Sequence, residues 1–144
     1  MGTSKNLLPK NVIFKEGEPA TDLYLVKSGK VVCLKASKDR LIPVFVADAE
    51  DILGESAMTP NGVYSYSAVS MTNCEIIAVQ SKDFTTVLDK APHWLNELTT
   101  TMINRFQDTA AIIAENRVVH PSILSEEDFS SALEIEYKKL LSLN

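Results

Sequence analysis

The stretch from Ile52 to Ala68 carries the residues best suited to bind a small molecule. An apolar pair leads into Gly54-Glu55, and the small residues Ser56 and Ala57 follow. The pattern predicts a strand, a tight turn, a single helical turn and a returning strand. The first amides of a helix have no partner within it, so they can receive an anion. We therefore expect an anion-binding turn here, beside one carboxylate.

The charge of this region does not match that expectation. No Lys or Arg occurs between Arg40 and Lys82. All charged residues of the segment from Leu41 to Ser81 are acids, namely Asp48, Glu50, Asp51, Glu55 and Glu75. Lys and Arg are the usual side-chain partners of phosphate. A phosphate bound at this turn would therefore have no positive partner from the segment.

Other kinds of chemistry find little support. His93 and His120 lie far apart, with no second His at ligand spacing, so no metal site is predicted. Cys33 and Cys74 have no neighbouring His and are interpreted as reduced thiols. We predict no catalytic residues, no metal and no cofactor, and hence a protein that is not an enzyme. An enzyme on a cupin-like barrel is the distant third interpretation.

Composition sets further bounds. The net charge of −5 argues against nucleic-acid binding, which requires clustered Lys and Arg. No apolar run approaches the roughly 20 residues of a membrane helix, and the N-terminus lacks the apolar core of a signal peptide. We therefore expect a cytoplasmic protein with neither a membrane nor a nucleic-acid partner.

The remaining sequence predicts the elements that position the turn. After a polar lead-in at residues 5–11, short apolar runs closed by turn residues recur up to Gln80, which is typical of a sandwich or barrel. Ser81 begins a helix, and Pro92 starts a second one that runs to 116. A tail helix is expected over 125–143, with Ser125 and Asp128 as its capping box.

Three segments resemble the cyclic-nucleotide-binding domain family. The first, from Ile13 to Gly29, has a glycine and an acid, a small residue, four apolar residues and a closing glycine (Gly17, Glu18, Ala20, Leu23 to Val26, Gly29). Asp51 to Met58 and Thr72 to Ile77 are similar to the family's ligand cassette and final strand. The resemblance covers roughly 5–117. It implies a mainly β fold: an eight-stranded antiparallel jelly roll (double-stranded β-helix) followed by two helices. Residues 118–144 are then a linker and the C-terminal tail helix.

The resemblance also implies roles for the candidate pocket, which comprises Gly54, Glu55, Ser56, Ala57, Tyr64, Ser65 and Tyr66. Glu55 stands where the family's Glu accepts a hydrogen bond from the ribose. Tyr64-Ser65 stands where an Arg-Ser or Arg-Thr pair binds the phosphate, and Tyr66 replaces a small residue. Glu55 is alternatively a solvated loop acid or a cap on local amides. The tyrosines are alternatively core or rim residues, and Tyr66 could fill the emptied pocket itself.

The second helix, 92–116, has an apolar stripe wider than one packing partner needs. The resemblance implies a twofold dimer through such a helix, with Leu98, Met102, Phe106 and Ile113 as contacts. The tail helix, 125–143, either folds back, crosses to a partner subunit or binds another protein. After Arg117 too few residues remain for a winged-helix DNA reader.

Two functions follow from these observations. The first is a non-enzymatic regulatory module that has lost the phosphate-binding arginine and acts by dimerisation or protein interaction, without binding cyclic nucleotide in the family's usual mode. The alternative is a small-molecule sensor that binds cyclic AMP, cyclic GMP or another nucleotide in an atypical mode.

Overall fold

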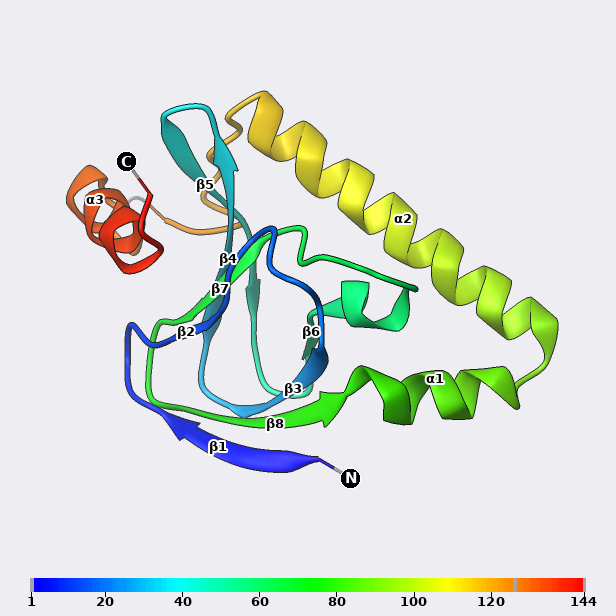
Figure 1. Cartoon of the computed structure of the whole chain (residues 1–144). Helices are drawn as coiled ribbons and strands as arrows, with labels where there is room; N and C mark the ends of the chain where they lie inside the picture. Colours follow the sequence, from blue (N-terminus) through cyan, green and yellow to red (C-terminus); the bar gives the residue numbers. More distant parts are fainter. Residues whose placement is uncertain (1, 126, 144) are drawn as a thin grey trace.

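Two antiparallel sheets, each of four strands, face one another in the computed structural model, which describes residues 2–125 and 127–143 (Figure 1). The first sheet has the order β1 (Thr3–Leu7), β8 (Cys74–Gln80), β3 (Asp22–Ser28), β6 (Ile52–Leu53). The second has the order β2 (Val12–Phe14), β7 (Ser67–Ser70), β4 (Val31–Ser37), β5 (Arg40–Ala47). A short 3-10 helix, η1 (Glu55–Met58), follows β6; the helices are α1 (Ser81–Asp89), α2 (His93–Glu115) and α3 (Ser131–Leu140).

This arrangement confirms the predicted mainly β jelly roll with two following helices and a tail helix. One strand differs from the prediction. The expected polar lead-in forms β1, which pairs with β8 from Thr3 opposite Ala78 to Leu7 opposite Cys74. The side chains of this edge strand are almost all exposed, so backbone hydrogen bonds hold it in place without an apolar pattern. Hydrophobic periodicity therefore gives no signal for it.

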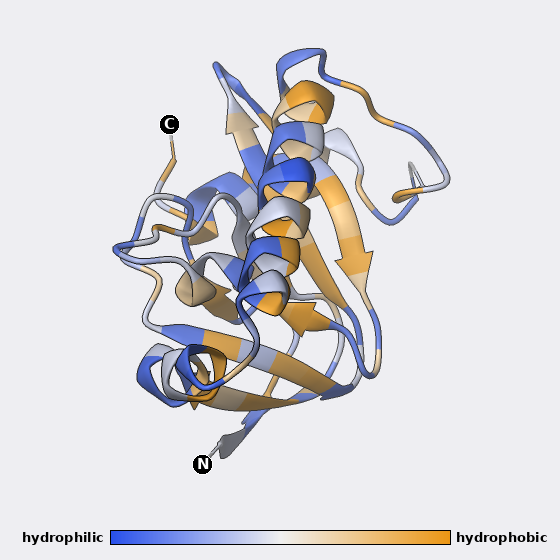
Figure 2. Ribbon diagram, turned by 90° about the vertical axis from the view of Figure 1, so that its right-hand side faces the viewer, coloured by the Kyte–Doolittle hydropathy of each residue, from blue (hydrophilic) through white to orange (hydrophobic). Residues whose placement is uncertain are grey.

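The main core lies between the sheets and beneath α2. Alternate residues of β4 separate two environments: Val31 and Cys33 point into this core, whereas Val32 and Leu34 belong to a second cluster on the other face. The C-terminal half of α2 adds Ala110 to the core. Figure 2 shows that the strands are largely hydrophobic and that α2 alternates between hydrophilic and hydrophobic residues. Each fully buried aliphatic side chain contributes about 1.5–3 kcal/mol.

The tail folds back onto the outer face of the second sheet. Phe129, Tyr137 and Leu141 are buried there against Val32 and other residues of that face. Because this face of the sheet is apolar, the tail shields it from water. Of the three arrangements expected for the tail, the structure has the folded-back one.

The tail helix begins later than predicted. Ser125 and Asp128 form the expected capping hydrogen bonds, from Asp128 N to Ser125 Oγ (3.2 Å) and from Ser125 Oγ to Asp128 Oδ2 (2.9 Å). These hydrogen bonds close a single turn instead of starting the helix. The next residue, Phe129, is buried in the cluster on the outer face of the second sheet. The helix starts after Ser130, whose Oγ accepts a hydrogen bond from Leu133 N. Glu126, within the predicted helix, lies outside the described residues.

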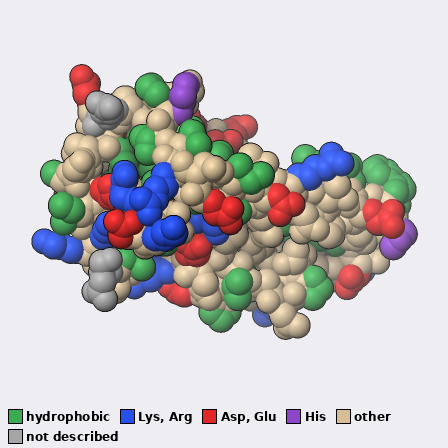
Figure 3. Space-filling view, turned by 90° about the horizontal axis from the view of Figure 1, so that it is seen from above, with side chains coloured by type: hydrophobic (Ala, Val, Ile, Leu, Met, Phe, Trp, Pro, Cys, Tyr) green, Lys and Arg blue, Asp and Glu red, His purple; other side chains and the backbone are tan. Residues whose placement is uncertain are grey.

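Polar contacts also attach α3 to the hairpin between β4 and β5. The Arg40 Nε–H donates to Glu134 Oε1 at 2.9 Å, and the Leu41 amide donates to the same oxygen at 3.0 Å. From α3, Lys138 Nζ donates to the Asp39 carbonyl. Arg117, which follows α2, pairs with the carboxylate of the same Asp39. Figure 3 shows Lys and Arg side chains gathered with acids at the end of the molecule that carries α3.

Candidate functional site

Two glycines shape the cassette between β6 and β7. Gly54 has φ +79°, in the left-handed region that side chains disfavour, and it turns the chain from β6 into η1. A Cβ atom on Gly62 would lie 2.0 Å from the carbonyl oxygen of Ser56, so only glycine allows this approach. From α2, Gln107 Nε2 donates to Ser56 Oγ at 2.9 Å. Ser56 of the cassette is thus contacted both by the loop at Gly62 and by Gln107 of α2.

The side chain of Tyr66 occupies the space beside Glu55. Tyr66 is 1% exposed, and its hydroxyl donates to Glu55 Oε2 at 2.8 Å. The Gly54 N–H donates to the same hydroxyl at 3.0 Å. The ring lies edge-on to Phe45 and Phe106, with centroids 5.2 and 6.0 Å away. Tyr66 therefore engages both the carboxylate and the first amide of the predicted ligand turn.

Tyr64 is also buried, at the position where the resemblance places an arginine. Its hydroxyl donates to the Asp22 carbonyl at 2.8 Å and accepts from the Asp22 N–H at 3.2 Å. Its ring stacks on Phe14 with centroids 4.0 Å apart. These contacts make Tyr64 part of the core. The Ala57 amide is likewise engaged, because it donates to the Gly54 carbonyl.

One base reaches the cassette from outside the segment considered in the sequence. Lys35 of β4 donates from Nζ to the Ser65 carbonyl at 2.7 Å and pairs with Glu16 Oε1 at 2.9 Å. Sequence reasoning missed Lys35, because pairing of β4 with β7 brings it there from a distant part of the chain. The hydroxyl of Ser65 is buried and has no hydrogen-bond partner among the described residues.

Burial raises the pKa of Glu55 above its usual value, although the hydrogen bonds from Tyr66 and from the backbone oppose this shift. Its other oxygen, Oε1, is buried and lacks a hydrogen-bond partner among the described residues. Burial likewise raises the pKa of Tyr66, which keeps the phenol a neutral donor. Burial, reinforced by the charge of Glu55, raises the pKa of the Cys33 thiol well above its ordinary value. Cys33 is therefore no thiolate nucleophile.

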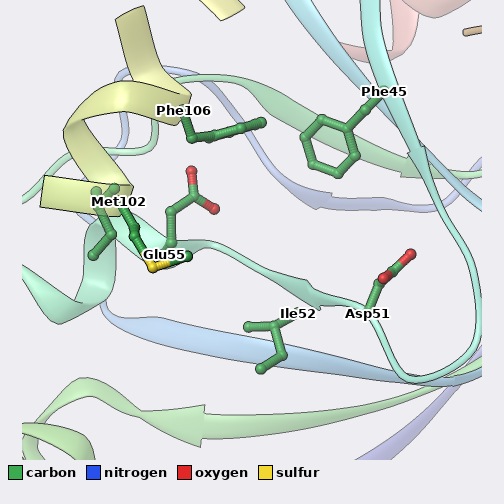
Figure 4. Close-up of a pocket in the computed structure, with 7 residues that line it drawn as sticks. Phe45, Asp51, Ile52, Glu55, Met102 and Phe106 are labelled. Atoms are coloured by element: carbon green, nitrogen blue, oxygen red, sulfur yellow. The ribbon is translucent and has the colours of Figure 1, made fainter. Parts of the chain in front are cut away.

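A cavity of about 310 Å³ lies between the cassette and α2 (Figure 4). Of the predicted pocket residues, only Glu55 lines it; Met102 and Phe106, predicted as dimer contacts, line it as well. The cavity wall further includes Phe45, Asp51, Ile52 and Ile103. In Figure 4 the Glu55 carboxylate points toward Phe106.

The fold agrees with what the comparisons find. A sequence model of the cyclic nucleotide-binding domain matches residues 4–91. The chain belongs to this family. A cAMP-dependent protein kinase regulatory subunit from Pyricularia oryzae is 32% identical over 80 residues, which cover 56% of this chain. The match spans only 20% of the regulatory subunit.

Solved structures give the same fold for this cyclic nucleotide-binding domain. The Thermus thermophilus catabolite activator protein has a TM-score of 0.64 and 21% identity, covering 78% of this chain and 53% of that protein. The EAL enzyme Bd1971 in its cGMP-bound form has a TM-score of 0.69 and 19% identity, covering 79% and 30%. At these identities the likeness shows the fold alone.

The predicted dimer residues of this cyclic nucleotide-binding domain do not share one free face. Leu98 and Met102 are 48% and 61% exposed, whereas Phe106 and Ile113 are partly buried against the core. The reason is helical geometry: α2 has about 3.6 residues per turn, so steps of four residues rotate gradually around the helix. The apolar stripe is therefore exposed in the N-terminal half of α2 and packs on the barrel in the C-terminal half.

Two other kinds of site are missing from the part of the chain that the structure describes. No group of three or more His, Cys, Asp or Glu side chains is placed to hold a metal ion in residues 2–125 and 127–143. In those same ranges, no helix combines the length and the apolar character needed to cross a bilayer.

Proposed function

We propose that this cyclic nucleotide-binding domain is a non-enzymatic regulatory module whose ligand pocket is closed by its own side chains. It acts through dimerisation or protein contacts. The observation that carries the proposal is the Tyr66 hydroxyl, which bonds both Glu55 Oε2 and the Gly54 amide. A ribose hydroxyl that used Glu55 in the manner the resemblance implies would have to displace this phenol.

The charge around the cassette supports the same conclusion. A charge-assisted hydrogen bond to phosphate contributes about 1.5–3 kcal/mol. Its loss lowers affinity by about tenfold to a hundredfold. Tyr64, at the arginine position, is committed to Asp22. Lys35 pairs with Glu16 and donates to the Ser65 carbonyl, so it would have to break both contacts to reach a phosphate.

The exposed face of α2 supports a partner contact. Trp94, Leu98 and Met102 lie four residues apart and are each about half exposed or more, at 62%, 48% and 61%. Such a stripe lies on one side of a helix. We propose that this N-terminal half of α2 forms the homodimer contact, while Phe106 and Ile113 belong to the barrel. On the tail helix, the exposed Ile135 is the candidate contact for another protein.

A thermal-shift panel with cyclic AMP, cyclic GMP and cyclic di-GMP tests the closed pocket. A ligand at a hundred times its Kd adds about 2.7 kcal/mol, which raises the Tm by several degrees. We expect no shift for the wild type. A shift of that size would overturn the closed pocket and favour the alternative, a sensor that binds a nucleotide atypically.

The matched variant is Tyr64→Arg with Tyr66→Ala, which restores the arginine and empties the space beside Glu55. We expect this double variant to gain a thermal shift with cyclic AMP. If a folded double variant gains none, the assignment of position 64 to the phosphate is wrong.

The dimer is tested by mass measurement in solution at high micromolar concentration. We expect a dimer for the wild type and a monomer for Leu98→Ser with Met102→Ser. Ile112→Ser is the control, because Ile112 is equally exposed but lies near the other end of α2. A monomeric wild type, or dissociation by Ile112→Ser alone, would contradict the contact.

A further inference from the structure

We propose that the cavity between the cassette and α2 binds an organic cation, an ammonium or guanidinium group on an apolar stem. The inference deepens the proposed function and rests on it, since Tyr66 must remain in place beside Glu55. The ligand class is opposite in charge to the anion that the sequence of the turn suggested.

The first support is the charge of the wall. Asp51 and Glu55 line the cavity, and no Lys or Arg is among the described residues that line it. The loop before β6 adds Glu50 nearby in the chain, whereas the Asp48 carboxylate is paired with Lys30. A site lined by charges of one sign raises the local concentration of ligands of the opposite sign. An anion would be repelled here.

The second support is the unsatisfied oxygen of Glu55. Oε2 accepts from the Tyr66 hydroxyl, whereas Oε1 is buried without a donor among the described residues. Buried polar atoms in native proteins nearly always have a partner. An ammonium or guanidinium N–H that reached Oε1 from the cavity side would provide one, as a charge-assisted hydrogen bond.

The third support is the aromatic wall. Phe45 and Phe106 meet edge to face with centroids 5.2 Å apart, and both line the cavity with Glu55. Aromatic rings attract cations through the negative charge of their faces. Ile52, which is 56% exposed, also lines the cavity and offers contacts to an apolar stem. A volume of about 310 Å³ limits the ligand to a small amine or one side chain.

Free amines and the Lys or Arg side chains of a protein share this chemistry. The experiment therefore titrates the whole chain, followed by amide NMR, with phenethylamine, agmatine and acetyl-arginine methylamide. Phenethyl alcohol and phenylacetate are the neutral and anionic controls of phenethylamine. We expect phenethylamine to bind about tenfold to a hundredfold more tightly than phenethyl alcohol. Tighter binding of the blocked arginine than of agmatine identifies a protein side chain as the source; the reverse identifies a free amine.

Glu55→Gln should remove the preference for the amine while keeping an oxygen for Tyr66. Glu50→Gln is the matched control, because it removes one charge from the same loop without lining the cavity. Equal loss in both variants would mean general attraction rather than a site. Equal binding of amine, alcohol and carboxylate by the wild type overturns the inference even if a variant does not fold. Binding of cyclic AMP, measured separately, would instead overturn the proposed function.

Discussion

Two carboxylates, the partly buried Glu55 in the cassette and the buried Glu134 in the tail helix, have opposite surroundings. Glu134 is 8% exposed and accepts from Arg40 and the Leu41 amide, with Lys138 nearby. The side-chain donor to Glu55 is the neutral Tyr66 hydroxyl, which bonds Oε2, and Oε1 has no side-chain partner among the described residues. Burial alone would raise both pKa values, but the bonds and charge of Arg40 bring the pKa of Glu134 below its usual value.

The difference separates a structural acid from a candidate binding acid. Glu134 attaches α3 to the β4–β5 hairpin, and its hydrogen bonds compensate for burial. Glu55 is not compensated in this way, because no base pairs with it among the described residues. Groups with uncompensated burial in a cavity are typical of functional sites. The cassette end is therefore the part of the molecule where a ligand or partner has most to gain.

The largest effect is expected for Tyr66→Ala, which removes the partner of Glu55. Tyr66 is fully buried between three aromatic rings, Phe14, Phe45 and Phe106. Truncation of a large aromatic core residue costs about 3–5 kcal/mol. Urea unfolding measures the loss. A loss below about 1 kcal/mol would mean that Tyr66 is not packed as described.

The next effect is expected for Glu134→Ala, which breaks the attachment of α3. Two hydrogen bonds to a charged group are lost, and the free energy of unfolding should fall by about 2–4 kcal/mol. Glu136→Ala is the control, since its pair with Lys10 is nearly half exposed and contributes below about 1 kcal/mol. Equal losses in the two variants, measured by urea unfolding, would remove the distinction between Glu134 and an ordinary surface acid.

A smaller effect is expected for Tyr66→Phe, which keeps the ring and removes the hydroxyl. The Gly54 amide and Glu55 Oε2 then lose their partner, at a cost of about 1–3 kcal/mol. Comparison with Tyr66→Ala in the same unfolding measurement separates the hydroxyl from the ring. An unchanged stability would show that the hydrogen bonds of the phenol contribute nothing.

The smallest effect is expected in the pH dependence of the free energy of unfolding. The contributions of Glu55 and Glu134 to its slope should have opposite signs. Above the ordinary value of 4.5, folded Glu55 keeps a proton that the unfolded chain has lost, so its contribution to stability is lost as pH rises through its folded pKa. Below 4.5, the unfolded chain gains a proton that folded Glu134 does not hold, so its contribution is lost as pH falls.

Glu55→Gln should thus reduce the loss of stability that occurs as pH rises above 4.5. Glu134→Gln should reduce the loss of stability that occurs as pH falls below 4.5. Urea unfolding at a series of pH values measures both slopes. If the two variants changed the slope in the same pH range, the contrast between the acids would be wrong.

Sequence patterns predicted the fold better than the site. Glycines such as Gly17, Gly29 and Gly54 have positive φ angles that few other residues adopt, so their spacing specified the turns. The 3.6-residue period of α2 specified that helix. The exposed edge strand β1 and the choice between two capping serines, Ser125 and Ser130, left no comparable signal.

The site depends on contacts that no local pattern encodes. Arg40 and Glu134 are 94 positions apart, and Lys35 reaches Ser65 only because β4 and β7 are neighbours. The sequence did suggest a pocket-filling role for Tyr66, since a large residue replaces a small one. Its bond to Glu55 joins residues on two sides of the turn at Gly54, and the spacing of residues does not determine that contact.

The central claim is that the Tyr66 hydroxyl occupies the cassette in place of a ligand. An amide NMR titration of the wild-type chain with cyclic AMP, followed at Gly54, Ser56 and Ala57, tests it most directly. We predict no saturable change at these amides up to millimolar cyclic AMP. Saturable chemical-shift changes at all three amides at micromolar cyclic AMP would show that the nucleotide displaces the Tyr66 hydroxyl, and would contradict the account.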